Sequence, residues 1–229
     1  MNEFNRTNIL LTPEEVSKIK NAKIAVFGLG GVGGYALEAL VRMGISNLIV
    51  IDGDTFEETN VNRQILALST TIGRLKTSVA KERILLINPE ANVLEYPIFI
   101  NRDTINKIDF SFDYIVDCID DVEAKILLIK EAKERNVPII SMMGAGSRLH
   151  ASFKVSDIYK SEGDPLAKKM RQRLREEDIS SLKVVYTDSP ALPLQVNSST
   201  HKIIVGSISY VVGMAGLSIA EEVIKDIVQ

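Results

Sequence analysis

KIAVFGLGGVGG, residues 23–34, is the stretch of sequence that decides the fold. Its apolar half, residues 23–27, predicts a short buried strand, and the glycines that follow end that strand in a turn. Helical periodicity then runs over residues 35–43, and a second apolar run, residues 47–51, stops at Asp52. Strand, glycine turn, helix and strand in this order are typical of the start of a nucleotide-binding sheet.

The alternation of apolar strands with amphipathic helices continues along the chain. The capping-box sequence at Thr12-Pro13-Glu14-Glu15 predicts a first helix that precedes the first strand. We expect helices over residues 13–20, 35–43, 73–87 and 122–135, and strands over residues 23–27, 47–51, 92–96, 114–118 and 138–142. This alternation predicts an α/β protein with a Rossmann-like, mostly parallel sheet that is covered by helices on both faces.

The pattern changes after residue 142. Two further strands are expected at residues 152–155 and 183–186, with a helix between them that starts at Asp164-Pro165, and residues 188–200 are expected to form a loop. We interpret this part as a small appended region of antiparallel strands and helix. The expected organisation is one adenylating domain over residues 1–229, with a nucleotide-binding core at 21–146, a substrate-side region at 147–205 and a buried C-terminal helix at 206–228.

Residues 203–220 carry no charge and reach the lower length limit for a membrane-spanning helix. Six of them are glycine or serine, which favours a short strand leading into a buried helix that another element contacts closely. We therefore expect no membrane insertion.

Composition narrows the class of protein. The chain has 27 Lys and Arg against 30 Asp and Glu, a net charge of −3, which argues against a protein that coats nucleic acid or anionic membranes nonspecifically. The single cysteine, Cys118, excludes an intramolecular disulfide framework and a zinc site made of cysteines alone. The N-terminal residues lack the layout of a signal peptide, so a cytoplasmic location is expected.

The glycine turn has the residue types that phosphate binding requires. Glycines at Gly28, Gly30, Gly31 and Gly33 allow a tight turn and close approach of the backbone to a phosphate, and the next helix supplies free N–H groups. Asp52, at the end of the second strand, can accept hydrogen bonds from ribose hydroxyls. These features alone suit NAD as well as ATP.

A series of polar residues after the second strand distinguishes between NAD and ATP as the expected nucleotide. In chain order it contains Asp52-Gly53-Asp54, the block Asn60-Val61-Asn62-Arg63-Gln64, Lys76, and Asp117-Cys118-Ile119-Asp120. With the double-glycine turn, this series resembles the ATP-dependent adenylating enzymes of the ThiF/MoeB/HesA superfamily, which includes the ubiquitin-activating enzymes. The resemblance covers residues 21–146.

The resemblance implies a role for each matching position. The glycine turn would bind phosphates, Asp52 would bind the ATP ribose, and Asp54, Asn60 and Gln64 would line the ATP site. Arg63 would reach the phosphates from the partner subunit of a homodimer, while Lys76 contacts them within the subunit. Asp120 would hold magnesium near the α-phosphate. Fixed cations of this kind stabilise the charge that builds up when a carboxylate attacks phosphorus, so the expected catalytic residues are Arg63, Lys76 and Asp120.

Within the superfamily, a second set of residues resembles the tRNA threonylcarbamoyladenosine dehydratases. It comprises Ile87-Asn88-Pro89-Glu90, Gly144-Ala145-Gly146, Val155-Ser156-Asp157-Ile158, Asp164-Pro165-Leu166-Ala167-Lys168 and Arg171-Gln172-Arg173-Leu174. The resemblance implies adenylation of the threonyl carboxylate of a modified adenosine next to the tRNA anticodon, with release of pyrophosphate. An atom of the carbamoyl group then closes a ring and AMP leaves. Cys118 is expected to be a packed, inert thiol.

The expected helix after Asp164 carries a cluster of cations. Leu166, Met170 and Leu174 share one face, and the other side of the helix would present basic residues to RNA phosphates. Together with Arg148 after the last parallel strand, the candidate tRNA-binding residues are Lys168, Lys169, Arg171, Arg173 and Arg175.

Two alternative functions remain open at this point. One keeps the chemistry but activates the C-terminal glycine of a ubiquitin-like sulfur-carrier protein; the lack of paired cysteines for zinc counts against it. The other is an NAD-binding dehydrogenase or nucleotide sensor, which would leave Arg63 and Lys76 without a purpose.

Overall fold

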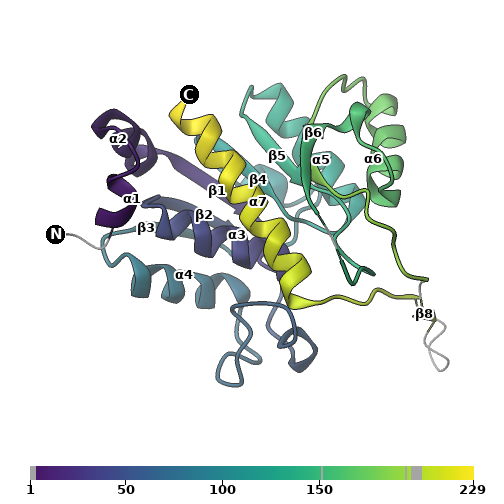
Figure 1. Ribbon diagram of the computed structural model, residues 1–229, viewed down its shortest axis with the longest axis horizontal. Helices are drawn as coiled ribbons and strands as arrows, with labels where there is room; N and C mark the ends of the chain where they lie inside the picture. The colour runs from purple at the N-terminus through teal and green to yellow at the C-terminus, as the bar shows by residue number, and fades with distance from the viewer. Residues whose placement is uncertain (1–3, 151, 194, 197–202) are drawn as a thin grey trace.

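The computed structural model describes residues 4–150, 152–193, 195–196 and 203–229. Its main sheet has seven strands in the order β3-β2-β1-β4-β5-β7-β6 (Figure 1). All neighbouring pairs are parallel except β6 with β7. The strands are β1 (Lys23–Phe27), β2 (Asn47–Ile51), β3 (Asn92–Tyr96), β4 (Tyr114–Asp117), β5 (Ile139–Met142), β6 (Lys154–Asp157) and β7 (Lys183–Tyr186), and a separate antiparallel pair joins β8 (Gln195–Val196) to β9 (Ile203–Ile204).

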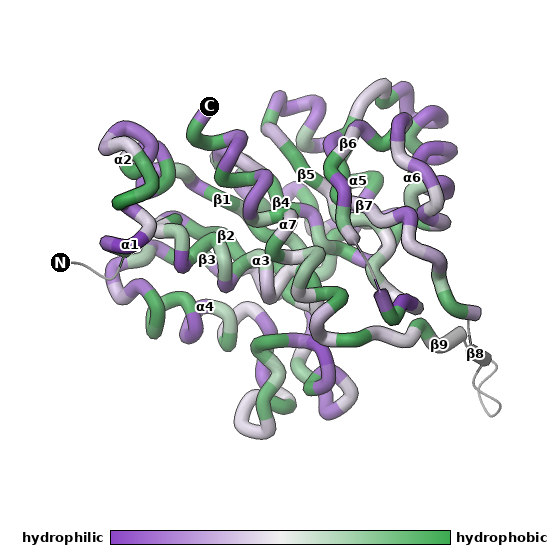
Figure 2. The backbone as a smooth tube through the Cα atoms, in the orientation of Figure 1, coloured by the Kyte–Doolittle hydropathy of each residue, from purple (hydrophilic) through white to green (hydrophobic). Residues whose placement is uncertain are grey.

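Helices cover both faces of this sheet. They are α1 (Asn5–Asn8), α2 (Pro13–Asn21), α3 (Gly31–Arg42), α4 (Lys76–Ile87), α5 (Val122–Glu134), α6 (Pro165–Glu176) and α7 (Ser209–Val228). Ile24 and Val26 of β1 pack with α3, α4 and α7 in one apolar cluster, while Ala25 and Phe27 pack with α5 and α6 in the other. The central strands are mostly hydrophobic and α6 is mostly hydrophilic (Figure 2), as expected for a parallel sheet buried on both sides.

The α/β fold with a mostly parallel sheet is confirmed, and several expected boundaries are wrong by a few residues. Helix α3 begins at Gly31 rather than at residue 35, because the last glycines of the turn already form its first turn. Helix α4 begins at Lys76 rather than at residue 73, since Gly73 adopts a φ of 80° that a right-handed helix excludes. Strand β6 covers Lys154–Asp157 rather than residues 152–155.

The appended region extends the same sheet. Strand β7 lies parallel to β5, and β6 adds an antiparallel edge. Asp164 caps α6 as expected, because its side chain accepts hydrogen bonds from the N–H groups of Leu166 and Ala167. Part of the expected substrate-side region lies outside the described residues, namely residues 151, 194 and 197–202. The expected loop at 188–200 is therefore described only at residues 188–193 and 195–196.

Helix α7 lies directly against α3, as the small residues of its sequence predicted. A Cβ atom at Gly216 would stand 2.5 Å from the Val32 carbonyl oxygen, and one at Gly213 would touch Tyr35. In the parts of the chain that the structure describes, no helix has both the length and the apolar character needed to cross a membrane.

Candidate active site

The glycine turn joins β1 to α3 at the carboxyl edge of the sheet. Gly28 adopts a φ of 86°, and its N–H donates to the Ile51 carbonyl of β2 at 2.8 Å. A Cβ atom at Gly33 would lie 1.8 Å from the Gly28 carbonyl oxygen, whereas one at Gly30 would meet nothing closer than 3.9 Å. Because no side chain caps α3, the N–H groups of its first turn can bind an anion.

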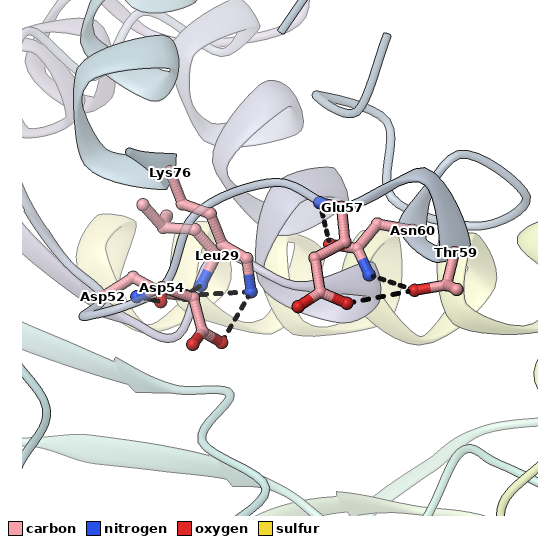
Figure 3. A network of polar contacts seen from close by, with 7 residues as sticks. All are labelled: Leu29, Asp52, Asp54, Glu57, Thr59, Asn60 and Lys76. Carbon is pink, nitrogen blue, oxygen red and sulfur yellow. Dashed lines mark hydrogen bonds and ion pairs between the residues drawn. The ribbon is translucent and has the colours of Figure 1, made fainter. Parts of the chain in front are cut away.

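Asp52, Asp54 and Lys76 form a network beside this turn (Figure 3). The Asp52 carboxylate accepts hydrogen bonds from the N–H of Leu29 at 2.7 Å and from the N–H of Asp54 at 2.8 Å. Lys76 Nζ lies 3.0 Å from Asp54 Oδ2 and 3.9 Å from Asp52 Oδ2. Burial raises the pKa of Asp52, and the Lys76 ammonium opposes this rise. Asp52 therefore couples the glycine turn to the start of α4.

The Asn60–Gln64 block folds over the same end of the sheet. Asn60 ends the short 3₁₀ helix Glu58–Asn60, and its Oδ1 accepts from the Glu57 N–H at 3.2 Å. Gln64 is 7% exposed, and its Oε1 is buried with no hydrogen-bond partner in the described part of the chain. Such an atom is costly to leave unpaired unless a ligand donates to it. Arg63 is half-buried, and its guanidinium donates to the Thr59 carbonyl at 2.8 Å.

The loop after β4 carries Asp120. Asp117, at the end of β4, pairs with Lys125 Nζ of α5 at 2.7 Å, and both side chains are fully buried. The other Asp117 oxygen accepts from the Ile119 N–H at 3.1 Å, which fixes the backbone just before Asp120. The sequence analysis missed Lys125, because nothing in a helical pattern marks one of its lysines as buried. Asp120 itself is exposed and lines the cavity described next.

One cavity of about 920 Å³ runs along the carboxyl edge of the sheet. Every expected ATP-site residue except Gly33 lines it, and Gly33 instead fixes the turn from behind by its contact with the Gly28 carbonyl. Cys118 also lines the cavity, and burial raises the pKa of its thiol to about 12. A neutral thiol is a poor nucleophile, which agrees with the expected inert role.

The far end of this cavity is built from segments that are distant in sequence. Arg148, which follows β5, lines the cavity there, as do Asp164, Leu192 and Val205. Asp164 Oδ2 accepts from the Gly144 N–H at 2.9 Å and so fastens the start of α6 to the end of β5. Arg148 is only 4% exposed and lines the cavity after the last parallel strand, apart from the other candidate tRNA-binding residues, which lie on α6.

The basic side of α6 divides into two groups of side chains. Arg171 donates to the Ser161 carbonyl at 2.9 Å and to its hydroxyl, Arg173 pairs with Glu123, and Arg175 lies over the Tyr159 ring at 5.3 Å. Lys168 and Lys169 are exposed to solvent. The structure thus gives Arg171 a role in holding α6 to the preceding turn.

A mostly parallel sheet, an uncapped helix N-terminus behind a glycine turn and a cavity at that edge lined by Lys76 and Arg63 together define a nucleotide-binding α/β protein. The comparisons with known proteins narrow this class. The family model described as ThiF family matches residues 4–229, and the chain belongs to that family.

Relatives within the family share most of this chain. A Bacillus subtilis (strain 168) protein named tRNA threonylcarbamoyladenosine dehydratase is 37% identical over 85% of this chain and 78% of its own length. A Haemophilus influenzae protein of the same name is 41% identical over 73% of this chain and 65% of its own length. The Escherichia coli dehydratase TcdA, solved in complex with AMP, superposes with a TM-score of 0.90 at 30% identity, covering 98% of this chain and 93% of that one. TcdA has also been solved in complex with ATP.

Proposed function

We propose that this protein is an ATP-dependent dehydratase that adenylates the threonyl carboxylate of threonylcarbamoyladenosine in tRNA and then cyclises that nucleoside. The observation that carries the proposal is the single cavity with two ends. One end has the glycine turn and Lys76 for a nucleotide, and the other has space beside Arg148 for a second substrate. Its volume, about 920 Å³, is near the upper end for ligand sites.

ATP would bind at the glycine-turn end. The N–H groups of Gly30, Gly31 and the first turn of α3 face the position of a phosphate chain. Asp52 keeps lone pairs for ribose hydroxyls beside its two backbone hydrogen bonds. The unpartnered Gln64 Oε1 can accept a hydrogen bond from the nucleotide. Asp54 holds Lys76 in place, and Lys76 with Arg63 supplies positive charge toward the phosphates.

Magnesium fits the same end. In the described part of the chain no three His, Cys, Asp or Glu side chains are grouped to hold a metal, but Mg²⁺ commonly takes one or two carboxylates and completes its shell with phosphate oxygens and water. The exposed Asp120 carboxylate in the cavity wall suits that mode. When bound, the ion would neutralise phosphate charge; the Asp117–Lys125 pair would keep the Asp120 loop in position.

The chemistry then takes place on the substrate. A carboxylate oxygen attacks the α-phosphorus, the bond from this phosphorus to the bridging oxygen breaks, and pyrophosphate leaves. An atom of the carbamoyl group attacks the acyl carbon, the bond to the AMP oxygen breaks, and a ring closes with release of a proton. The protein binds and orients both partners, and no step requires Cys118.

The tRNA would lie across the mouth of the cavity on the α6 side. Lys168 and Lys169 are exposed there, and they are the α6 residues best suited to phosphate contact. Arg173 and Arg175 would also contact RNA phosphates once Arg173 leaves Glu123 and Arg175 leaves the Tyr159 ring. An enzyme that acts on tRNA would act in the cytoplasm. The strands of the core and of the appended region belong to one sheet, which supports a single adenylating domain over residues 1–229.

A homodimer in which Arg63 reaches the partner's cavity is the arrangement we propose. Tyr210, Met214 and Leu217 form an exposed apolar stripe on one face of α7, of the kind that a second copy covers. Asn62 donates to the Ser207 carbonyl at 3.0 Å, so the Arg63 loop lies beside the start of this stripe. Arg63 also lines the cavity of its own chain.

The proposed function is tested by product release. Purified protein with ATP and magnesium should release AMP and pyrophosphate when given tRNA that carries threonylcarbamoyladenosine, and not when given the same tRNA without the modification. Equal AMP release from both tRNAs would show that the substrate is wrong. An adenylate trapped on a carrier protein ending in Gly-Gly would favour the sulfur-carrier alternative, and tight NAD binding without any response to ATP would favour the dehydrogenase alternative.

A further inference from the structure

Arg148 is a buried cation at the end of the cavity away from the glycine turn. Its Nε donates to the Ser189 carbonyl at 3.0 Å and its Nη1 donates to the Gly146 carbonyl at 2.9 Å. Its Nη2 is buried and has no hydrogen-bond partner among the residues that the structure describes. Two backbone carbonyls therefore fix the plane of the guanidinium and leave one donor nitrogen unused.

No carboxylate among the described residues lies within ion-pair distance of Arg148. Asp164, which lines the same end of the cavity, already accepts from the N–H groups of Gly144, Leu166 and Ala167. A buried guanidinium always carries its charge, and burying a charge without a counter-ion is costly. The site is therefore prepared for an anion that arrives with a ligand.

The order of the strands sets Arg148 apart from the glycine turn, so the two would hold different parts of the bound ligands. The glycine turn follows β1, whereas Arg148 follows β5, and β4 lies between them. Adjacent strands are about 4.8 Å apart, so strands β1 and β5 themselves are separated by about 10 Å across the sheet. Asp120, which follows β4, lies between the two ends.

The backbone turns sharply just before Arg148. Ser147 has a φ of 55°, in the left-handed region that non-glycine residues seldom adopt. Its N–H donates to the Gly206 carbonyl and its carbonyl accepts from the Leu192 N–H, both at 2.6 Å. These contacts hold Arg148 in the cavity wall from two distant segments.

We infer that Arg148 binds the carboxylate of the acceptor substrate, the group that becomes adenylated; this inference rests on the proposed function. With Nε and Nη1 engaged by carbonyls, Nη2 can hold one carboxylate oxygen and leave the other free to attack the α-phosphorus. Arg148 is thus the residue that selects an anionic side chain on the modified nucleoside and orients it toward ATP.

The first test compares the Arg148→Gln and Arg148→Lys variants of the full chain with the wild type. Arg148→Gln should lower kcat/KM for threonylcarbamoyladenosine-tRNA by about 10- to 100-fold, the usual effect of losing one charged hydrogen bond, and Arg148→Lys should fall in between. The Kd for ATP without tRNA should stay within about twofold of the wild type. Arg135→Gln, at a remote arginine paired with Glu131, is the matched control and should change neither quantity.

The second test begins with a comparison on the wild type, and the result of that comparison does not depend on whether a variant folds. Calorimetry with an ATP analogue bridged by methylene between the α and β phosphorus atoms would compare free threonylcarbamoyladenosine with its neutral carboxamide. The carboxylate form should bind at least about 10-fold more tightly, and this preference should disappear in Arg148→Gln.

Each outcome decides the inference. Equal binding of the two nucleosides by the wild type, or unchanged kcat/KM in Arg148→Gln, overturns the assignment of Arg148 alone. A large loss of ATP affinity in Arg148→Gln also overturns it, because the residue would then belong to the phosphate site. A wild type that releases no AMP with the modified tRNA overturns the proposed function and this assignment together.

Discussion

The two ends of the cavity are built in different ways. The nucleotide end comes largely from consecutive elements of the chain, since the glycine turn, Asp52 and Lys76 are linked by contacts between residues 23 and 22 positions apart. The substrate end combines the segment after β5 with Asp164, the loop after β7 and the residues before α7. A site made of local motifs can be recognised in a sequence, whereas a site assembled from distant segments depends on the whole fold.

Replacing Gly33 should have the largest effect on stability, because it would displace the backbone of the glycine turn at the nucleotide end. A Cβ atom in Gly33→Ala would lie 1.8 Å from the Gly28 carbonyl oxygen, so the turn must move, at a cost of about 3 kcal/mol or more in the free energy of unfolding. Urea unfolding would measure it. Gly30→Ala is the matched control: its Cβ meets nothing closer than 3.9 Å, so it should stay folded and lose ATP affinity. Equal stabilities would contradict this account of the turn.

Removing the Lys76 cation at the nucleotide end should lower the rate of AMP release. Lys76→Gln should lower kcat for AMP release by about 10² to 10³, as for other electrostatic stabilisers, with a folded protein by circular dichroism. Lys81→Gln, on the exposed side of the same helix where Lys81 pairs with Glu95, should leave the rate within about twofold of the wild type. A similar loss in both variants would indicate a general effect on α4.

Mixing two inactive variants tests whether the nucleotide end is completed by a second copy. Arg63→Ala and Asp120→Ala should each abolish turnover. If Arg63 acts across a dimer, each mixed dimer has one intact site, so an equal mixture should recover about a quarter of the wild-type rate after subunit exchange. No recovery, with exchange verified by mass spectrometry, would place Arg63 in its own subunit's site.

Variants of α6 near the substrate end can separate residues that stabilise the fold from residues that contact tRNA. Arg171→Ala should destabilise the protein by about 2 kcal/mol, because Ser161 loses its charged donor. The double variant Lys168→Gln with Lys169→Gln should instead leave stability unchanged and reduce the salt dependence of tRNA binding by about two counterions. Thermal unfolding and filter binding at several salt concentrations would check these. The reverse result would move the RNA contact to Arg171.

Cys118 lies between the two ends and should show the smallest effect on turnover. Cys118→Ala should keep the rate within about twofold, because no step needs a thiolate. Since burial raises the pKa of the thiol to about 12, the thiolate is scarce at about pH 8, and alkylation by iodoacetamide should be about 10³-fold slower than in the unfolded chain and rise with pH. Mass spectrometry would follow the reaction; rapid modification of the native protein would contradict this view.

Sequence analysis predicted the core of the fold well. Strands β2, β3 and β7 have the expected bounds, because short apolar runs that end at polar residues leave little freedom. The starts of α2, α5 and α6 are also as expected, whereas those of α3 and α4 are not. The glycines that end β1 also form the first turn of α3, and composition does not show where the turn stops and the helix begins. Lys125 and the buried position of Arg148 were missed, because burial of a charged residue depends on the element that packs over it.

The sequence by itself therefore determined the strand–turn–helix units, the nucleotide end and the absence of a cysteine-based zinc site, since each depends on local spacing or on a count of residues. Only the tertiary structure decided that β7 extends the sheet beside β5 and that Arg171 holds α6 to the preceding turn. It also decided that Arg148 lies in the cavity wall with one donor nitrogen unpaired among the described residues. The physical reason is that hydrogen-bond partners at the substrate end come from segments tens of residues apart, and only folding brings them within bonding distance.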